Sequence, residues 1–425
     1  MRYSVLSINQ PERDELMNKT KSFDIPKQLI GKAYKQVSKN KGVEGVDGIT
    51  ILKFNEDLKG NLYKLWNRMS SGSYCPKPLR VVKIPKNTGG HRILCIPTVY
   101  DRVAQTAVAM YLQPLVEPTF HENSYGYRPN KSALDAVDMA RKTCWKYDWV
   151  IDLDIAEFFD SLDHDLVLQS IKMYTNCKWV ILYVERWLKV PMQWENGTMI
   201  ERNKGIPQGS PISPIISNIV LHLVFDNWMK QEYPTIPFER YVDDVIVHCK
   251  TYKQASFMKE VIRKRLLKFS LKLQMEKTSI VYCKDNARTE IFSKYTFDFL
   301  GYTFRPRKAR SQKGGGSFTS FLPAISNKAK KKIKQNIRAW RLHQRTGTTL
   351  ERIAEKINPI VRGWVQYYGR FYKSEMYIMI WNIENYLLRW VRAKCKNFRN
   401  KVKHSCKFIS KIKKRFPSFF YHWTV

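Results

Sequence analysis

The sequence lacks the signatures of a secreted, a membrane-spanning or a zinc-binding protein. Its eight cysteines include no C-x-x-C pair, and no histidine is spaced as a zinc partner, so neither a disulfide framework nor a metal knuckle is expected. The N-terminus has no apolar run of signal-peptide length. Residues 206–225 carry no charge, yet they contain three prolines besides Ser, Asn and Gln, which a bilayer core tolerates poorly. We therefore expect reduced thiols in an intracellular protein, and a loop leading into a buried helix at 206–225.

Acidic residues are scarce, and their scarcity is uneven along the chain. Lys and Arg number 74 against 37 Asp and Glu, a formal net charge of +37. This surplus exceeds what solubility needs and indicates a polyanionic partner, with nucleic acid as the leading candidate. Residues 302–345 hold thirteen Lys or Arg and no acid, and residues 326–425 hold 25 basic against four acidic residues. The 425 residues predict two or three domains, the last of them a basic helical module.

The hydrophobic pattern predicts an α+β fold with a mixed or antiparallel sheet. Residues 25–70 have helical spacing, and SYCPKPLRVVKIPKNTGGHRILCIP indicates two strands around a Gly-Gly turn. WVIDLDIAEFF indicates a buried strand with an acidic end, and SLDHDLVLQSIKMY a capped helix. RSQKGGG marks a flexible beginning of the basic module. Further helices are expected at 98–118, 131–146 and 252–270, a Gly/Pro loop with a helix at 205–230, and a further strand near 296–304.

The stretch RYVDDVIVH, residues 240–248, places two carboxylates inside an apolar, β-branched run. Strands usually avoid Asp, and successive side chains of a strand point to opposite faces. Asp243 and Asp244 can therefore approach one site only where the chain folds back, so the stretch predicts a hairpin with the acid pair at its turn. Taken alone, the pair is best explained by the turn-forming tendency of Asp.

A second acidic cluster, IDLDIAEFFD, places Asp152 and Asp154 on one face of the expected strand. Nucleotidyl transfer needs carboxylates from different strands to hold two Mg²⁺ ions, because one ion activates the attacking hydroxyl and the other steadies the leaving pyrophosphate. Asp154 alone is explained by a helix cap or an ion pair. Together with the basic surplus, the two acidic strand ends favour a metal site for nucleotidyl transfer.

Five stretches occur in a fixed order: DIAEFFDSLDH, GIPQGSPISPIISNI, YVDD, LQMEKTSIVY and FDFLGY. In this order and at these spacings they resemble the successive motifs of reverse transcriptases. GVDGIT, KIPKNTGGHR, NSYGYRPNKSALDA and KINPIVRGWVQYYGRF resemble more narrowly the bacterial reverse transcriptase/maturases encoded by group II introns. The resemblance spans roughly residues 25–425.

The resemblance implies a right-hand polymerase with fingers and an antiparallel-sheet palm, followed by an α-helical thumb, the maturase domain X. No counterpart of the endonuclease domain of some relatives is recognised, so target-strand nicking is not expected. The implied domains are an N-terminal extension with the start of the fingers at 1–75, the reverse transcriptase fingers and palm at 76–305, the thumb at 306–395 and a short basic DNA-binding region at 396–425.

The resemblance also makes Asp154, Asp243 and Asp244 the catalytic, metal-binding triad, with the carbonyl of Ile155 as a further ligand. The implied cofactor is a pair of Mg²⁺ ions, for which Mn²⁺ can substitute. Relatives of the intron type usually carry Ala where this sequence has Val242. The bulkier side chain is expected to touch the primer end and to affect fidelity or primer use.

Further residues are implied to contact the incoming dNTP. Phe159 matches an aromatic gate that leaves no space for a 2′-hydroxyl, although by itself it could be a core residue. Lys86 and Arg92 flank the turn of the basic hairpin and match residues that clamp triphosphate oxygens, although alone they would be solvated turn charges. Gln208 lies in PQGS, where glycines allow close backbone approach to the nascent base pair. Lys277 matches a lysine near the leaving pyrophosphate.

The thumb is expected to bind RNA through Lys331, Lys332, Lys334 and Arg338. The expected function is RNA-directed DNA polymerisation together with binding of the host group II intron RNA, which assists splicing and retrohoming. Expected partners are this intron RNA, an RNA template with a DNA or RNA primer, a DNA target and dNTPs. Binding to a membrane is not expected. The expected location is the prokaryotic cytoplasm, with association to the nucleoid during homing.

Two alternatives stay open from the sequence. One is a domesticated reverse transcriptase of the same lineage that acts in DNA repair or phage defence. The other is a non-enzymatic RNA-binding splicing factor with a vestigial polymerase site. The intact acid triad speaks against the second, whereas only the DNA that flanks the gene separates the first from an intron-encoded protein. The oligomeric state stays open as well.

Overall fold

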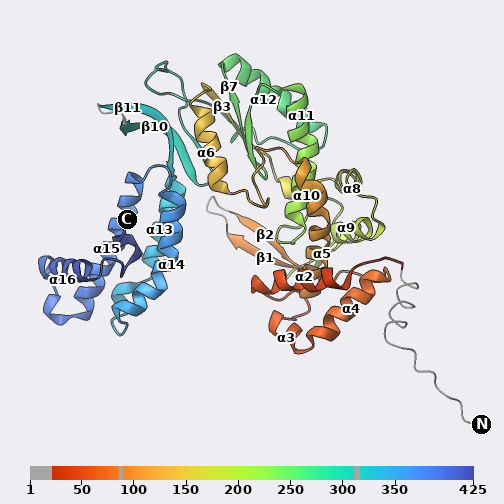
Figure 1. Ribbon diagram of the computed structural model, residues 1–425, viewed down its shortest axis with the longest axis horizontal. Coiled ribbons are helices and arrows are strands. Elements are labelled where there is room, and N and C mark those ends of the chain that lie inside the picture. The colour runs from red at the N-terminus through yellow and green to blue at the C-terminus, as the bar shows by residue number, and fades with distance from the viewer. Residues whose placement is uncertain (1–21, 86–89, 311–315) are drawn as a thin grey trace, which may run out of the picture.

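The computed structural model describes residues 22–85, 90–310 and 316–425 and has the predicted α+β architecture (Figure 1). The C-terminal helices, drawn in blue, gather on one side of the molecule, and the N-terminal helices, drawn in red and orange, lie on the other. In the part of the chain that the structure describes, no helix has the length and apolar character needed to cross a bilayer.

From residue 22 onward, the N-terminal part contains α2 (Lys27–Lys39), α3 (Ile51–Glu56) and α4 (Leu58–Ser70). The apolar positions of α2, among them Ile30 and Val37, recur at helical spacing and are buried. This helix packs on α5 (Val99–Val116), and the indole N–H of Trp66 in α4 donates to the carbonyl of Ile25 at 2.7 Å. The helical spacing predicted for this region is confirmed.

The predicted basic hairpin is formed by β1 (Leu79–Pro85) and β2 (His91–Ile96), which pair antiparallel. Val81 and Cys95 near its base are buried, whereas the side chains toward its tip are exposed. The hairpin is therefore anchored at one end, and its described residues at the other end are exposed. Two short strands extend the sheet to the order β2-β1-β4-β5: β4 (Met192–Gln193), parallel to β1, and β5 (Met199–Ile200).

The palm sheet comprises β3 (Trp149–Asp154), β6 (Phe238–Tyr241), β7 (Asp244–Cys249) and β8 (Ser279–Tyr282), in the antiparallel order β6-β7-β3-β8. Ile151 and Leu153 face the large core shared with the N-terminal helices, while Val150 faces a second core. α12 (Tyr252–Leu267) covers the first face and α6 (Ala133–Cys144) the second. Because both faces are covered, β3 is mostly apolar and becomes acidic only toward its end.

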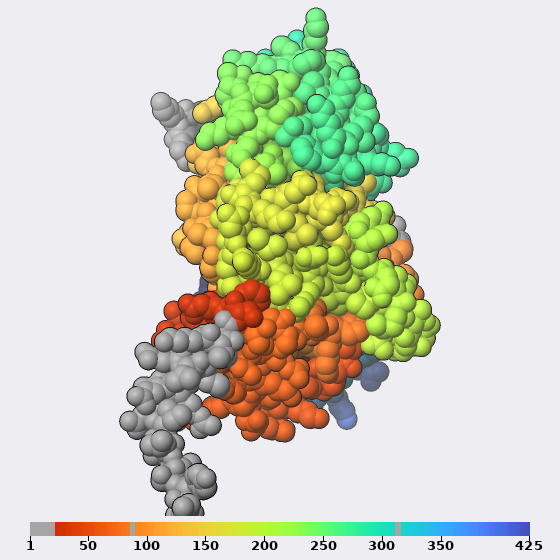
Figure 2. All heavy atoms as spheres, turned by 90° about the vertical axis from the view of Figure 1, so that its right-hand side faces the viewer, coloured from red at the N-terminus to blue at the C-terminus, as the bar shows by residue number. Residues whose placement is uncertain are grey.

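Five further helices surround the palm: α7 (Phe158–Ser161), α8 (His164–Lys172), α9 (Lys178–Lys189), α10 (Ser213–Leu221) and α11 (Asn227–Glu232). The charge-free stretch 206–225 is a loop followed by α10, whose Ile216 and Ile219 are buried, as predicted. A π-helical turn at His222–Asp226, which was not predicted, joins α10 to α11. On the face drawn in Figure 2, the N-terminal helices, the region of α8 and α9, and α12 follow one another from bottom to top.

A second antiparallel sheet connects the palm to the thumb. It consists of β9 (Phe297–Phe299), β10 (Tyr302–Arg310) and β11 (Ser317–Ile325), in the order β11-β10-β9. β9 and β10 cover the strand predicted near 296–304, whereas β11 was not predicted. β10 runs across residue 305, where the sequence places the boundary between palm and thumb.

The thumb contains α13 (Asn327–Ala339), α14 (Leu350–Tyr368) and α15 (Ser374–Lys394), and α16 (Val402–Arg415) follows in the basic region 396–425. These helices enclose a core of their own. α15 contributes Met379, Ile383 and Leu387 to this core, and the segment after α16 contributes Phe420. The predicted helical thumb is confirmed.

Short 3₁₀-helices occur at Glu117–Thr119, Leu342–Gln344, Lys396–Phe398 and Tyr421–Trp423.

Candidate active site

The palm strands bring the three predicted acids to one end of the sheet. Asp154 ends β3 and lies directly opposite Asp244, which begins β7. Val242 and Asp243 form the two-residue turn between β6 and β7. Directly opposed residues of antiparallel strands have Cβ atoms about 5 Å apart on the same face. The predicted hairpin with the acid pair at its turn is confirmed.

Burial and mutual repulsion raise the pKa values of Asp243 and Asp244. For Asp244, desolvation is the larger cause and the charges of Asp243 and Asp154 add to it, so that its pKa rises to about 6. Desolvation and the charge of Asp154 likewise raise the pKa of Asp243, against the opposing charge of Arg92. Burial raises the pKa of Asp152, inside β3, to about 7. Carboxylates that repel one another at one point attract a shared cation.

The donor set fits divalent ions that prefer oxygen ligands. Asp154 and Asp244 keep part of their surface exposed, so both side chains can turn toward an ion. The two backbone hydrogen bonds next to Ile155 use the carbonyl of Asp154 and the amide of Ala156, each at 2.8 Å, and not the carbonyl of Ile155 itself. Among residues 22–85, 90–310 and 316–425, no three Asp, Glu, His or Cys side chains already stand close enough to hold a metal ion.

Two of the predicted cations lie beside the acids. The Nζ of Lys277 is 3.5 Å from Oδ2 of Asp154. Arg92, exposed on β2, is near enough to Asp243 for its charge to oppose the rise of that pKa. The basic hairpin and the acidic turn therefore face a common site. Lys86 lies outside the described residues.

Phe159 lies on α7, next to the loop that contains Gln208. Its side chain is half-buried, and its ring meets that of Phe158 edge to face at 5.4 Å between centroids. Its carbonyl accepts a hydrogen bond from the amide of Ile206 at 2.7 Å. The ring is therefore held by a packed neighbour and by a fixed backbone.

The loop around Gln208 links the basic hairpin of β1 and β2, called the fingers hairpin from here on, to the palm. The backbone carbonyl of Gln208 accepts a hydrogen bond from the amide of Cys95 in β2 at 2.8 Å. The side-chain Nε2 of Gln208 donates to Oδ2 of Asp160 at 3.3 Å. Gly209 has φ +110°, and a Cβ at this residue would lie 2.8 Å from the carbonyl oxygen of Cys95. Only glycine permits this close contact between loop and strand.

The side chain of Val242 is buried beneath the acidic turn. It is 4% exposed and sits against Gly126, because the turn backbone at φ +60° directs it beneath the hairpin. The predicted contact of this side chain with a primer end stays a prediction. An effect of Val242 on fidelity or primer use stays a prediction.

Sequence reasoning also missed the residue that supports the acidic turn. Arg240 is completely buried on β6 and pairs with the equally buried Asp226. The available signal was the position of an arginine inside an apolar strand, directly before the acid pair, because buried arginines occur almost only with a partner.

Three of the four predicted RNA-binding residues share a groove in the thumb. Lys331, Lys334 and Arg338 recur along α13 and line a groove of 570 Å³ together with residues of α15. Lys332 is exposed but does not line the groove, because one residue turns a helix by about 100°. The structure thus separates Lys332 from the other three.

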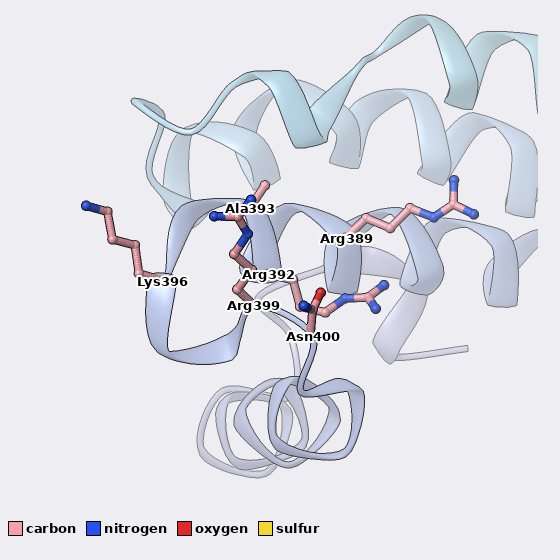
Figure 3. Close-up of a pocket in the computed structure, with 6 residues that line it drawn as sticks. All are labelled: Arg389, Arg392, Ala393, Lys396, Arg399 and Asn400. Atoms are coloured by element: carbon pink, nitrogen blue, oxygen red, sulfur yellow. The ribbon is translucent and has the colours of Figure 1, made fainter.

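A second basic pocket, of 490 Å³, lies at the C-terminal end of α15 and was not predicted (Figure 3). No acidic side chain is among the residues that line it. The repetition of basic residues every three to four positions from 389 to 399 is the sequence signal that could have revealed it. The lining residues are Arg389, Arg392, Ala393, Lys396, Arg399 and Asn400.

Comparison with known proteins decides the family. Residues 84–304, just over half of the chain, match the family described as reverse transcriptase (RNA-dependent DNA polymerase), and residues 330–407 match the group II intron, maturase-specific domain. The chain belongs to the group II intron reverse transcriptases. The first match contains Asp154, Asp243 and Asp244, and the second contains Lys331, Lys334 and Arg338 of the groove on α13.

Individual relatives of this reverse transcriptase differ in length. It is 30% identical to protein YkfC of Escherichia coli over 325 residues, 67% of this chain and 81% of YkfC. It is 26% identical to the group II intron-encoded protein LtrA of Lactococcus lactis over 373 residues, 72% of this chain and 60% of LtrA. It is 31% identical to the COX1/OXI3 intron 1 protein of Saccharomyces cerevisiae over 261 residues, 61% of this chain and 30% of that protein. The chain thus spans less than two-thirds of the latter two relatives.

A solved structure of telomerase from Candida albicans with a fragment of telomeric RNA is similar at 14% identity and a TM-score of 0.47, over 81% of this chain and 62% of the telomerase. The family assignment confirms the resemblance stated from the motifs and the α+β polymerase class of this reverse transcriptase. Reverse transcriptases are in general metal-dependent enzymes. The roles of the single site residues stay predictions.

Proposed function

We propose that this chain is an RNA-directed DNA polymerase that extends a DNA or RNA primer on an RNA template with dNTPs. The observation that carries the proposal is the register of the palm sheet, which sets Asp154 opposite Asp244 with Asp243 in the adjoining turn. In a family of polymerases, carboxylates from two strands at one point match what nucleotidyl transfer requires. The net charge of +37 supports a nucleic-acid template.

Asp154, Asp243 and Asp244, with the carbonyl of Ile155, would hold two Mg²⁺ ions, or Mn²⁺ in their place. When bound, such ions make the 3′-hydroxyl of a primer more acidic and neutralise the departing pyrophosphate. The protein itself supplies the fixed spacing of the carboxylates. Lys277, 3.5 Å from Asp154, adds a positive charge where the pyrophosphate would leave.

Side chains around the acids would select the dNTP. The ring of Phe159 would fill the space that a 2′-hydroxyl requires. Gln208, tied to the fingers hairpin through Cys95, would touch the nascent base pair. Arg92 and Lys86 would bind triphosphate oxygens, one as a planar fork and the other as a point charge.

Exchange of both Asp243 and Asp244 for Ala tests the polymerase assignment. Because the site loses ligands for both ions, extension of oligo(dT) on poly(rA) with dTTP should fall by about a thousandfold or more, while RNA binding persists. Asp138→Ala, which removes a carboxylate that pairs with Arg141 on α6, serves as the control and should extend at the parental rate. Unchanged extension by the double variant would return the acid pair to a turn-forming role.

The thumb supports a second activity, binding of the host intron RNA to assist splicing. Residues 330–407 match the maturase-specific domain, and two basic cavities open on α13 and α15. A folded intron supplies its own chemistry, so the protein needs only to bind its active fold more tightly than other folds. For retrohoming, the basic region 396–425 would contact the DNA target, in the cytoplasm and at the nucleoid.

Two other functions remain as alternatives. A splicing factor with a vestigial polymerase site would not need the three acids, all of which are present. A domesticated polymerase in DNA repair or phage defence would keep the acids but have no host intron. The presence or absence of a folded group II intron around the gene separates this last alternative from the proposal.

A further inference from the structure

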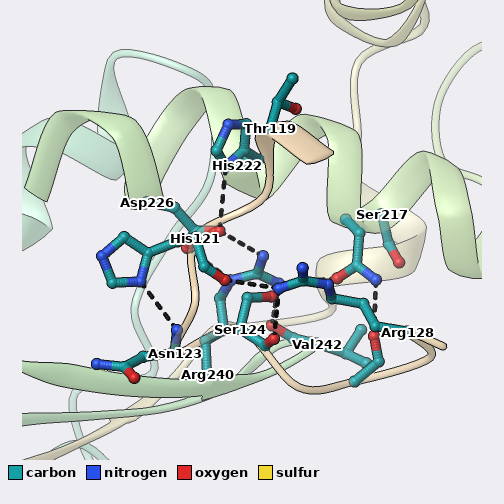
Figure 4. Close-up of polar contacts among 12 residues, drawn as sticks. Thr119, His121, Asn123, Ser124, Arg128, Ser217, His222, Asp226, Arg240 and Val242 are labelled. Atoms are coloured by element: carbon teal, nitrogen blue, oxygen red, sulfur yellow. Dashed lines mark hydrogen bonds and ion pairs between the residues drawn. The ribbon is translucent and has the colours of Figure 1, made fainter. Parts of the chain in front are cut away.

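A buried arginine lies beneath the turn that carries the acid pair. Arg240, two residues before Val242, is 0% exposed. Its Nε and Nη2 donate to the two carboxylate oxygens of Asp226 at 2.7 and 2.6 Å (Figure 4). Asp226 belongs to the π-helical turn between α10 and α11, and such local widenings of a helix often occur at functional sites.

The remaining guanidinium nitrogen of Arg240 reaches the turn itself. Its Nη1 donates to the carbonyl of Val242 at 3.1 Å and to Oδ1 of Asn218 in α10 at 3.0 Å. Asn218 in turn donates its Nδ2 to the carbonyl of Gly126 at 2.7 Å. A Cβ at Gly126 would lie 2.7 Å from the amide nitrogen of Val242, so this segment touches the turn from below. Arg240, Asn218 and Gly126 thus form one continuous support.

The turn needs a support because its backbone is strained. Val242 has φ +60°, a left-handed conformation that β-branched residues rarely adopt. Two-residue hairpin turns with positive φ usually carry Asn, Asp or Gly. A residue in such a conformation keeps it only where its surroundings enforce it.

The choice of a buried ion pair also indicates a geometrical role. Apolar side chains of similar volume would often stabilise a core as well as a buried ion pair does. Burial would raise the pKa of Asp226, but Arg240 and then His222 lower it below its usual value, which favours the charged carboxylate. A guanidinium is moreover a planar fork, which fixes the direction of each of its hydrogen bonds.

We propose that Arg240, held by Asp226 and Asn218, is a positioning residue that keeps Val242 in its left-handed conformation and thereby aims Asp243 and Asp244 at the site opposite Asp154. This inference rests on the proposed catalytic role of the acids. It goes beyond that role, because it states that the positions of the acids depend on hydrogen bonds to residues of α10 and of the π-helical turn.

Two variants of the full-length chain test the support. Arg240→Lys keeps a positive charge beside Asp226 but removes the fork, and Asn218→Ala removes the link to Gly126. Ser217→Ala is the matched control, because Ser217 is buried next to Asn218 but donates to the carbonyl of Pro214, away from the turn. All variants are compared at a temperature at which each gives the circular-dichroism spectrum of the parent.

Extension of oligo(dT) on poly(rA) is measured as kcat, as KM for dTTP and as the Mg²⁺ concentration for half-maximal rate. For both variants we expect a kcat at least tenfold lower and an Mg²⁺ requirement at least threefold higher, with KM for dTTP and RNA affinity within twofold of the parent. A role in stability alone would lower the melting temperature and leave the Mg²⁺ requirement unchanged. That result would overturn the proposal.

A change at Val242 separates alignment from packing. Gly adopts φ +60° without strain, whereas Ala removes the same branched side chain but keeps the penalty. The loss caused by Arg240→Lys should therefore shrink at least threefold in a Val242→Gly background and not in a Val242→Ala background. Equal losses in both backgrounds would contradict the proposal.

The result for Asp244→Ala shows which assignment has failed. If this variant still extends primers, the proposed function itself is wrong, and the support with it. If it is inactive while Arg240→Lys and Asn218→Ala extend like the parent, the acids are catalytic and only the positioning role is wrong.

Discussion

The ring of Phe159 is fixed from two sides, by the edge-to-face contact with Phe158 and by the hydrogen bond from the amide of Ile206 to its own carbonyl. A fixed ring can exclude a hydroxyl because it cannot move aside. For Phe159→Val we expect the ratio of rUTP to dTTP incorporation to rise at least tenfold, which corresponds to about 1.4 kcal/mol between the two transition states. Single-turnover extension with each nucleotide measures this ratio.

The neighbouring ring provides the control for this exchange. Phe158 is 2% exposed in the large core, so Phe158→Leu should lower the free energy of unfolding by about 1 kcal/mol without changing the nucleotide ratio. If Phe159→Val keeps the parental ratio, the residue belongs to the core only and the ribose gate lies elsewhere.

At the same scale, the sequence revealed the acids but not their support. Asp243 and Asp244 were recognisable because carboxylates are rare inside an apolar strand. Arg240 stands in the same stretch, but its partner Asp226 comes from another element, and a local pattern does not show which distant side chains will meet. The buried orientation of Val242 depends on a single positive φ, which no pattern of a β-branched residue predicts.

Among the elements, the contact between the fingers hairpin and the loop of Gln208 is the one most open to test. Gly209→Ala would place a Cβ 2.8 Å from the carbonyl oxygen of Cys95, so the loop or β2 has to shift. Displacement of a substrate-positioning group by about 1 Å can cost a hundredfold in rate, so we expect extension to fall at least tenfold. Primer extension and the melting temperature are measured together.

The control for this exchange is a glycine with a similar backbone but open surroundings. Gly197, in the turn between β4 and β5, has φ +85°, and apart from Gly197 and its two chain neighbours no described residue has an atom within 4 Å of the position that a Cβ would take there. Gly197→Ala should therefore carry only the conformational penalty of about 1–2 kcal/mol and leave extension unchanged. Equal rates for both variants would show that the contact between loop and hairpin does not position the site.

The long periodic elements were predictable from the sequence, whereas two short features were not. α5, α6, β3 and α12 follow apolar patterns that a covered sheet and its covering helices require. β11 was missed because its strand pattern, FTSFLPAI, contains Pro323 and follows a glycine-rich stretch, so that pairing with β10 decides its structure. The π-helical turn depends on one extra residue per turn, which leaves no mark on a pattern of apolar side chains.

At the scale of the whole molecule, the three acids and most of the basic surplus lie in different parts of the chain. The fingers and palm share the large core and hold the acids, while the thumb has its own core and carries most of the basic surplus. Residues 326–425 alone contribute 25 basic and four acidic side chains, a net +21. Because Lys331 and Lys334 are exposed on α13 and belong to no core, changes at these residues should leave the palm folded.

Charge reversal on the two faces of α13 should therefore separate splicing from polymerisation. Lys331→Glu with Lys334→Glu changes the groove, and Lys328→Glu with Lys332→Glu makes the same change of charge outside it. The groove variant should lose most protein-assisted splicing of the host intron at low Mg²⁺ and retain primer extension on a short template. The control variant should keep both activities, and Asp244→Ala should show the reverse of the groove variant.

The salt dependence of binding gives an independent measure of the same groove. Each phosphate contact contributes about 0.7 to 0.9 to the slope of log affinity against log salt concentration, because bound cations release counterions from RNA. Loss of two contacts should reduce that slope by about 1.4 to 1.8 for the groove variant and leave it unchanged for the control. Equal slopes for both variants would show that the groove does not bind the intron RNA. If the parent protein stimulates splicing of no intron that flanks its gene, the maturase assignment is wrong, and a domesticated polymerase becomes the better explanation of the same acids and the same basic thumb.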